Sequence, residues 1–227
     1  MNFEIIPAII PKNIEDAKRR LSEVRGVAPV VQIDILDGKF VPNTSYPYGD
    51  SNENHFKKTI EGVEKFPYSD EFYMEADLMI ENPENSIDKF AFAGFNRIVA
   101  HIESTNNMMD IINNARNLDL EIGIAINIDT PNEVIDEYVD KIDFVQFMGI
   151  AKIGFQGESF DGRVVEKICK FKDVHSDIII SVDGGVNLKN ASYLLGAGAR
   201  RLVAGSAIFG SNDAARAIEN FKLISLL

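Results

Sequence analysis

The chain has 227 residues, 45% of them hydrophobic, with a formal net charge of −12 and a pI of about 4.7. This length suits one large α/β domain or two small ones, and the acidity argues against nucleic acid as a partner, because binding to a phosphate backbone needs a basic surface. No run of about 18 apolar residues predicts a membrane span, and the N-terminal stretch MNFEIIPAIIPK has neither the basic region nor the cleavage site of an export signal.

Strand-like and helix-like segments alternate from one end of the chain to the other. Apolar runs predict strands at residues 3–10, 29–36, 71–80, 96–102, 120–128, 142–148, 176–185 and 199–204. Amphipathic patterns predict helices at residues 13–24, 55–66, 81–94, 106–118, 130–141, 161–172, 187–198 and 212–224. Asn13 is a plausible N-cap of the first helix, and Gly94 follows the end of the third.

The eight βα units predict the fold class. They are evenly spaced, no linker or change of composition divides them, and the strands are apolar runs, as expected when both faces are buried. We therefore expect a single (β/α)₈ TIM barrel over residues 1–227, with a doubly wound open sheet as the alternative. The single cysteine, Cys169, falls in a helical pattern where we expect a small buried side chain, and its presence alone fits a reducing cytoplasm.

Two aspartates end apolar runs that the sequence predicts as strands. Asp34 ends VVQID and Asp183 ends IIISVD, and glycine-bearing turns follow both. Because the carboxyl ends of barrel strands meet on one face, these two carboxylates are expected to approach a bound molecule from two sides. That arrangement suits the removal of a proton from one side of a carbon and its return on the other. The alternative is that each aspartate caps the following turn.

Glycine-bearing turns after the last three strands predict a phosphate site. They contain Gly154 and Gly157, the pair Gly184 and Gly185, and the pair Gly205 and Ser206. Glycine lets the backbone approach a ligand closely, and barrels often hold a phosphate near the loops after strands seven and eight. Each turn alone is a weak signal, because glycine after a strand is commonly only a turn residue.

With these residues in hand, the chain resembles the ribulose-phosphate 3-epimerase family over nearly its whole length. The matching stretches, in order, are IDILDGKFVPN (33–43), DLMIENPE (77–84), HIES (101–104), NIDTP (127–131), GFQGESF (154–160), SVDGGVN (181–187) and VAGSAIF (203–209). The resemblance implies a cytoplasmic isomerase of carbohydrate metabolism, an epimerase that acts on pentose phosphates such as ribulose phosphate. It also implies a barrel of the ribulose-phosphate-binding type and a homo-oligomer.

The resemblance also implies roles for individual residues. Asp34 and Asp183 match the two acid/base groups of the family, which work through an enediolate. In the family these two aspartates and two histidines bind a divalent metal that stabilises the enediolate. Met79 and Met148 match methionines that line the site, although ordinary core packing is an equal alternative. The turns at Gly184 and Gly205 match the phosphate-binding backbone.

Both metal-binding histidines of the family are replaced in this chain, by Gln32 and Asp77. The candidate metal shell is therefore Gln32, Asp34, Asp77 and Asp183, which offers only oxygen. Such a shell favours Mg²⁺ or Mn²⁺ over Zn²⁺ or Fe²⁺. The alternative is that no metal binds; crowded carboxylates then raise at least one pKa, and a protonated Asp77 takes over part of the metal's role.

Two more departures concern the substrate. The family usually has Ser-Ile-Leu-Ser where this chain has residues 8–11 as Ala-Ile-Ile-Pro, so a hydroxyl near the substrate is missing. The loop GIAKIGFQGE at 149–158 adds Lys152, which either reaches a phosphate or is solvated. The leading hypothesis is a sugar-phosphate epimerase. The alternatives are another phosphosugar reaction, by a metal-assisted decarboxylase or an aldolase, and a sugar-phosphate-binding protein without catalysis.

Overall fold

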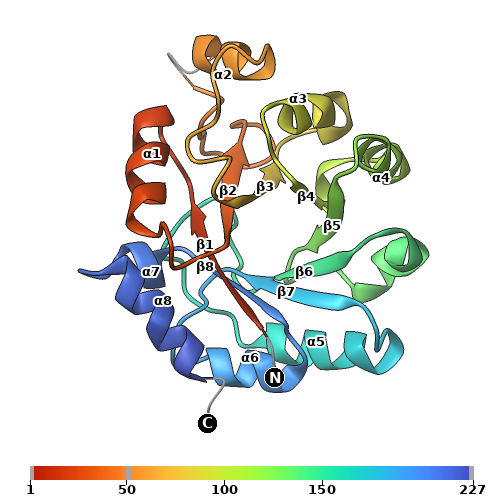
Figure 1. Cartoon of the computed structure of the whole chain (residues 1–227). Coiled ribbons are helices and arrows are strands. Elements are labelled where there is room, and N and C mark those ends of the chain that lie inside the picture. The colour runs from red at the N-terminus through yellow and green to blue at the C-terminus, as the bar shows by residue number, and fades with distance from the viewer. Residues whose placement is uncertain (1–2, 50–52, 225–227) are drawn as a thin grey trace.

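The computed structural model describes residues 3–49 and 53–224 and shows a closed barrel of eight parallel strands in sequential order (Figure 1). Each strand pairs with the next, and the first pairs with the last, so the prediction of a (β/α)₈ TIM barrel is confirmed. The strands are β1 (Glu4–Ile9), β2 (Val30–Leu36), β3 (Tyr73–Met79), β4 (Arg97–His101), β5 (Glu121–Ile126), β6 (Phe144–Met148), β7 (Ile179–Asp183) and β8 (Arg201–Ala204).

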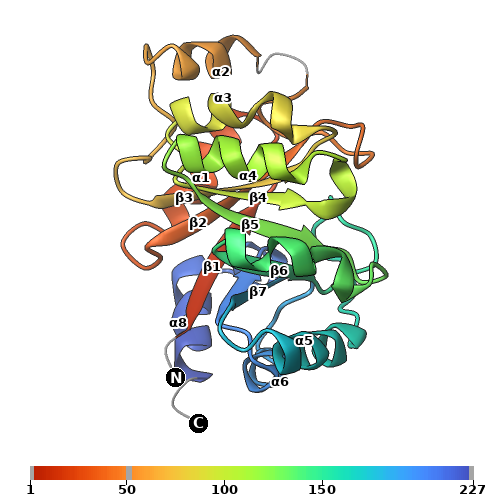
Figure 2. The same cartoon turned by 90° about the vertical axis from the view of Figure 1, so that its right-hand side faces the viewer.

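Helices surround the barrel, as Figure 2 shows for α3, α4 and α5. The α-helices are α1 (Ile14–Glu23), α2 (Glu53–Ile60), α3 (Ile87–Phe92), α4 (Met108–Asn117), α5 (Arg163–Val174), α6 (Ala191–Ala197), α7 (Ser206–Phe209) and α8 (Ala214–Leu223). Three 3₁₀ helices among the described residues are η1 (Pro83–Asn85), η2 (Ile102–Ser104) and η3 (Asn132–Lys141). No helix in this part of the chain is long and apolar enough to cross a membrane.

The predicted helices hold with local differences. Asn13 caps α1 as expected, since its side chain accepts a hydrogen bond from the backbone nitrogen of Asp16. The second helix ends at Ile60 because Gly62 takes a left-handed backbone conformation with φ of +72°. The segment expected as an α-helix at 130–141 forms η3 instead, and its β-branched residues and aspartates are weak α-helix formers. Cys169 is exposed on α5, so the expectation of a buried side chain was wrong.

The two faces of each strand differ in chemistry. Outward-facing residues such as Ile33, Ala76 and Val182 belong to the large apolar core between the strands and the helices. Several strands carry polar residues two positions apart, and residues at that spacing share one face of a strand. These polar residues point into the barrel, so the barrel interior is much more polar than the apolar runs suggested. The strands carrying such pairs are β2 with Gln32 and Asp34, β3 with Glu75 and Asp77, and β7 with Ser181 and Asp183.

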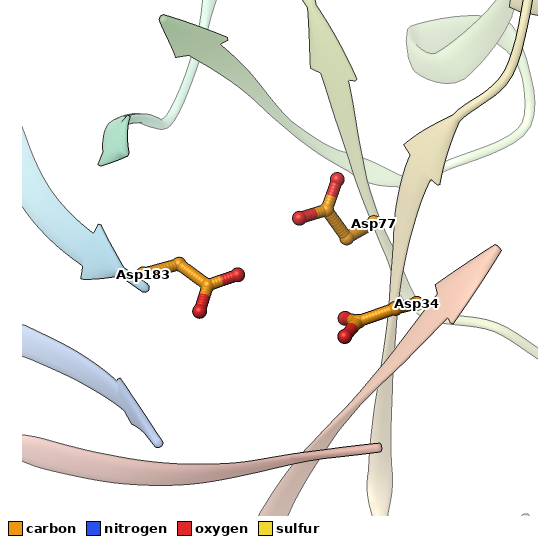
Figure 3. Close-up of side chains that lie close together, drawn as sticks. All are labelled: Asp34, Asp77 and Asp183. Carbon is orange, nitrogen blue, oxygen red and sulfur yellow. The ribbon is translucent and has the colours of Figure 1, made fainter. Parts of the chain in front are cut away.

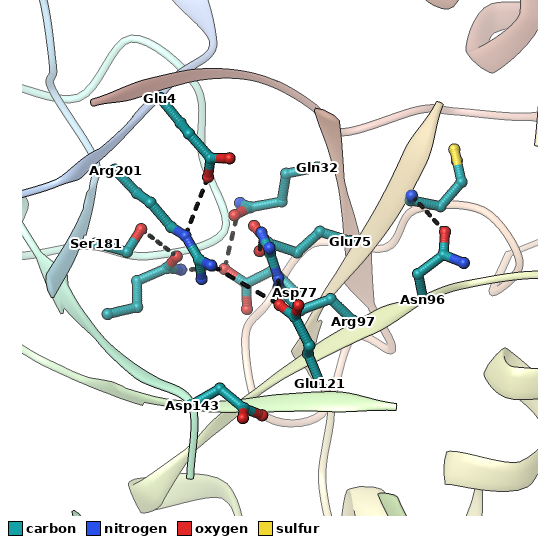
Figure 4. A network of polar contacts seen from close by, with 12 residues as sticks. Glu4, Gln32, Glu75, Asp77, Asn96, Arg97, Glu121, Asp143, Ser181 and Arg201 are labelled. Atoms are coloured by element: carbon teal, nitrogen blue, oxygen red, sulfur yellow. Dashed lines mark hydrogen bonds and ion pairs between the residues drawn. The ribbon is translucent and has the colours of Figure 1, made fainter. Parts of the chain in front are cut away.

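The floor of the barrel is built from charged groups around one aromatic ring. Arg97 is paired with Glu75 at 2.9 Å and with Glu121 at 2.6 Å (Figure 4). The guanidinium groups of Arg97 and Arg201 lie 5.4 Å and 4.5 Å from the centre of the Phe144 ring. A polar layer therefore closes one end of the barrel, and Asp34, Asp77 and Asp183 lie toward the opposite end.

Candidate active site

Three aspartates converge inside the barrel near the carboxyl ends of their strands (Figure 3). Asp34 and Asp77 are register partners on β2 and β3, and Asp183 is the last residue of β7. One carboxylate oxygen of each lies within 4.8 Å of the others. The structure therefore brings together three of the four residues predicted as a metal shell. Their carboxylates form an acidic centre that could hold a metal ion.

Gln32, the fourth predicted member, presents nitrogen to this centre. Its Nε2 donates to Asp34 Oδ1 at 2.8 Å and to Asp183 Oδ2 at 3.0 Å, with Asp77 Oδ2 at 3.5 Å. Gln32 is completely buried, and its Oε1 is buried without a hydrogen-bond partner. A single amide thus joins carboxylates from β2, β3 and β7.

Asp77 has further partners that the sequence did not reveal. Gln146 Nε2 donates to Asp77 Oδ2 at 2.9 Å, and His101 Nε2 lies 3.1 Å from Asp77 Oδ1. Both partners are completely buried, and the ring of His101 packs against Phe40 with centroids 5.4 Å apart. Burial acts to lower the pKa of His101, but the charge of Asp77 and the hydrogen bond to it outweigh burial and raise that pKa.

The electrostatics of the other two aspartates favour their protonated forms. Burial raises the pKa of Asp34 well above its usual value, and the negative charges of Asp183 and Asp77 add to this effect. Burial and the charge of Asp77 raise the pKa of Asp183 to about 7, although hydrogen bonds from Gln32 and Gly184 oppose the change. The negative charges of neighbouring aspartates therefore add to burial in raising the pKa of both Asp34 and Asp183.

A narrow cavity opens beside Asp34 and Asp183, and Gln32 and Asp77 do not line it. Asp77 is completely buried, whereas Asp34 is 6% exposed. The two groups predicted as acid/base residues thus face the cavity, while the other two lie behind them. The cavity also brings together every residue predicted to contact substrate, which are Met79, Met148, Gly154, Gly157, Gly184, Gly185, Gly205 and Ser206.

Gly184 and Gly185 form the tight turn that follows Asp183. Both have positive φ, +97° and +68°. A Cβ atom on Gly184 would lie 2.7 Å from Ile150 Cγ1, and one on Gly185 would lie 2.7 Å from Phe160 Cα. The positive φ angles and the close neighbours both exclude a side chain at these two positions, so the backbone itself borders the cavity at this turn.

The loop after β6 closes over the cavity through two contacts that the sequence did not predict. Gln156 Nε2 donates to Ala8 O at 3.2 Å, and Asn43 Nδ2 donates to Gly154 O at 3.0 Å. Ala8 and Ile10 line the cavity, whereas Pro11, which stands where the family has the serine near the substrate, does not. Lys152 is exposed and does not line the cavity.

Comparisons with known proteins match this chain to one family over most of its length. The model of the ribulose-phosphate 3 epimerase family matches residues 4–209. The chain is 31% identical over 226 residues to ribulose-phosphate 3-epimerase of Bacillus subtilis, which covers 97% of this chain and 98% of that protein. The chain is 32% identical over 198 residues to ribulose-phosphate 3-epimerase of Methanocaldococcus jannaschii, and the match covers 86% of this chain and 78% of that protein.

Solved structures show the same fold. The 3-keto-L-gulonate-6-phosphate decarboxylase of Vibrio cholerae matches with a TM-score of 0.71 and covers 99% of each chain. Its sequence identity is 16%, so this similarity supports the barrel and carries no conclusion about the reaction.

Proposed function

This chain belongs to the ribulose-phosphate 3-epimerase family, and from that membership we propose that Asp34 and Asp183 carry out its proton transfers. The protein is a sugar-phosphate epimerase, an isomerase. The observation that carries the proposal is that both carboxylates reach the same cavity from strands on different sides of the barrel mouth. We propose a ketopentose phosphate, interconverted between ribulose 5-phosphate and xylulose 5-phosphate, as the substrate.

The two carboxylates act as one pair that shares a proton. The ionised member takes the C3 proton of the substrate, which leaves a planar enediolate. The protonated member then gives its proton to the opposite face of C3, so the configuration inverts. The raised pKa values of Asp34 and Asp183 support this arrangement, because one of the two remains protonated near neutral pH.

Backbone groups hold the phosphate in this proposal. The turns at Gly184–Gly185 and Gly205–Ser206 border the cavity next to Asp183, and Gly154 and Gly157 border it from the loop after β6. No lysine or arginine is among the described residues that line the cavity. Backbone N–H groups are the donors that suit a phosphate in such a place, and the absence of a lysine there disfavours a Schiff-base aldolase.

A hard divalent cation fits the donor set of the acidic centre. Carboxylate oxygens of Asp34, Asp77 and Asp183 would hold it. Gln32 presents Nε2 to this centre, so it would be a fourth ligand only after rotation of its amide turned the unpaired Oε1 inward. All four atoms are oxygens, so Mg²⁺ or Mn²⁺ is preferred to Zn²⁺ or Fe²⁺. When bound, such an ion would supply Lewis-acid stabilisation of negative charge on substrate oxygens.

Proton NMR in D₂O tests the function. Purified protein is mixed with ribulose 5-phosphate or xylulose 5-phosphate, first with EDTA and then with Mg²⁺, Mn²⁺ or Zn²⁺. We expect the C3 proton signal to disappear and the other epimer to form. If the C3 proton does not exchange under any of these conditions, the proposal is wrong. A different reaction, or binding of a phosphosugar without catalysis, is then favoured.

We also propose that the whole chain, residues 1–227, works as one barrel domain in the cytoplasm. The pairing of β1 with β8 supports one domain, since the first and last strands complete the same sheet. The lone cysteine supports a reducing compartment. The homo-oligomer expected from the sequence stays a prediction.

A further inference from the structure

We propose that Gln32 is a positioning residue that holds Asp34 and Asp183 together for proton transfer without a metal ion. Its amide nitrogen lies at the point that a cation would occupy. This inference rests on the proposed function, because it assumes that the two carboxylates are the acid/base pair. The new element is the role of Gln32, whose side chain bridges the two carboxyl groups.

The hydrogen-bond geometry assigns both protons of the Gln32 amide to the pair. A side-chain amide nitrogen carries two hydrogens, and its two shorter contacts, 2.8 Å and 3.0 Å, go to Asp34 and Asp183. The third contact, to Asp77, is at 3.5 Å and is the weakest. One nitrogen therefore joins the carboxyl groups of Asp34 and Asp183 and fixes their separation.

Asp77 is stabilised by other groups, which leaves Gln32 free for the pair. Gln146 donates to Asp77 Oδ2 at 2.9 Å, and His101 lies 3.1 Å from Asp77 Oδ1. These two partners come from β4 and β6, and neither lines the cavity. The centre thus contains two sets of donors, one for the acid/base pair and one for the carboxylate behind it.

The same geometry makes amide donation and cation binding mutually exclusive. Gln32 Nε2 lies among carboxylate oxygens that are within 4.8 Å of one another, which is the place a shared cation would take. Rotation of the amide by about 180° exchanges its nitrogen and oxygen. The rotated oxygen would face three carboxylates and would be repelled unless a cation lay between them. The unpaired Oε1 in the present arrangement is the atom that such a rotation would turn into a ligand.

Gln32 does not touch the substrate in this arrangement. It is completely buried, and the residues that line the cavity do not include it. Its loss should therefore lower the rate of proton transfer and leave substrate binding by the glycine turns intact. A shift of about 1 Å in a reacting group costs about a hundredfold in rate.

The chain offers a matched control in Gln146. It is also a completely buried amide and also donates to Asp77, but it contacts neither Asp34 nor Asp183. Comparison of Gln32→Leu with Gln146→Leu therefore separates the bridging role from the general loss of a buried amide. Comparison of Gln32→Glu with Gln146→Glu does the same for cation binding.

The experiment measures C3-proton exchange with EDTA present, together with Mn²⁺ affinity by calorimetry. We expect the wild type to exchange without metal, and Gln32→Leu to lose about a hundredfold in kcat with little change in KM, while Gln146→Leu loses less. Gln32→Glu should lose metal-free exchange, bind Mn²⁺ more tightly than the wild type and Gln146→Glu, and recover exchange when Mn²⁺ is added.

Three outcomes overturn the inference, and they are distinguishable. Wild-type exchange only with added metal would keep the proposed function and remove the metal-free role of Gln32. Equal losses in Gln32→Leu and Gln146→Leu would reduce Gln32 to a packing residue. No wild-type exchange in any condition would remove the proposed function and the inference with it.

A measurement on the wild type covers the case in which a variant does not fold. In ¹⁵N-labelled protein with EDTA, the side-chain N–H₂ protons of Gln32 should be protected from solvent, and their signals should shift when excess Mg²⁺ is added. Rapidly exchanging Gln32 side-chain protons would contradict the bridging geometry.

Discussion

Asp34 and Asp77 are register partners on neighbouring strands, yet their carboxylates lie in different surroundings. Asp34 borders the cavity, whereas Asp77 is completely buried with Gln146 and His101 at its two oxygens. Two aspartates side by side in a sheet can thus differ in role because their partners differ. In the proposed function, Asp34 exchanges a proton with the substrate, and the charge of Asp77 raises the pKa of Asp34 and Asp183.

Replacing either member of the pair should stop proton exchange. We expect Asp34→Asn and Asp183→Asn each to lower C3-proton exchange by about a thousandfold, since general acid–base groups contribute about 10²–10⁴ in rate. The fold should persist, because asparagine has the shape of a protonated aspartate. NMR exchange in D₂O and a thermal melt are the measurements. Exchange at the wild-type rate in either variant would rule out the acid/base role of the residue replaced.

The pH dependence of metal-free exchange follows from the raised pKa values. Asp183 has a pKa of about 7, and its ionised form is needed if Asp34 holds the shared proton. With EDTA present, kcat/KM should therefore rise with pH through about 7 and fall again when Asp34 loses its proton. The pH profile of kcat/KM is the measurement.

Asp77→Asn should move that profile. The charge of Asp77 raises the pKa of both Asp34 and Asp183, so its removal lowers both values. Both limbs of the profile should shift to lower pH, while Gln146→Leu, which keeps the charge, serves as the control. A profile unchanged by Asp77→Asn would mean that its charge is screened from the pair.

The sequence predicted that Asp34 and Asp183 would lie close together, because strand ends of a parallel barrel meet on one face. Gln32 and Asp34 are two residues apart on β2, so both point into the barrel. His101 and Gln146 were missed as neighbours of Asp77, because these contacts depend on how β3, β4 and β6 face one another across the barrel. Such distances depend on barrel closure and strand register, which a single strand's pattern does not contain.

Local structure was harder to predict where propensity and context disagree. The segment Asn132–Lys141 has helical spacing of its apolar residues but forms a 3₁₀ helix with Ile135 buried. Cys169 follows the buried Ile168 on α5 and points outward, so a small apolar residue in a helical pattern did not indicate its burial. The first case depends on the backbone hydrogen-bond pattern of the segment, and the second on the position of Cys169 around the axis of α5.

Folding stability should also depend on Asp183, in the opposite sense to an ordinary salt-bridged aspartate. Its pKa is raised from 3.8 to about 7 on folding, so its contribution is fully present below pH 3.8 and is lost as pH rises toward 7. With EDTA present, Asp183→Asn should gain stability relative to the wild type as pH rises from 4 to 8, by on the order of 4 kcal/mol. Denaturant unfolding at several pH values measures this, and a difference that does not change with pH would contradict it.

The buried pair beneath the site should show strong coupling. Arg97 and Glu75 are 2.9 Å apart with side chains 4% and 0% exposed, and burial raises the pKa of Glu75 despite Arg97. Arg97→Met leaves a buried carboxylate without its partner and should cost about 3–5 kcal/mol of unfolding free energy. Adding Glu75→Gln should recover much of this loss, and a double-mutant cycle gives the coupling. Additive losses would show that the two side chains act independently.

The turn at Gly185 should be intolerant of any side chain. Its φ of +68° is unfavourable for alanine, and a Cβ would lie 2.7 Å from Phe160 Cα and 2.9 Å from Phe160 Cβ. The backbone of the turn must therefore move, and with it the N–H groups proposed to hold the phosphate. Gly185→Ala should raise KM by about tenfold or more, since each 1.4 kcal/mol of lost binding is tenfold.

The open position Gly157 provides the control for that substitution. It also lines the cavity and has a φ of +82°, but a Cβ there would meet nothing within 4 Å. Gly157→Ala carries the backbone strain without the collision, so its KM should rise less than that of Gly185→Ala. Steady-state kinetics with ribulose 5-phosphate and calorimetry with inorganic phosphate separate binding from turnover. Equal effects at the two positions would mean that strain in the backbone, and not the close approach to Phe160, sets the shape of the phosphate site.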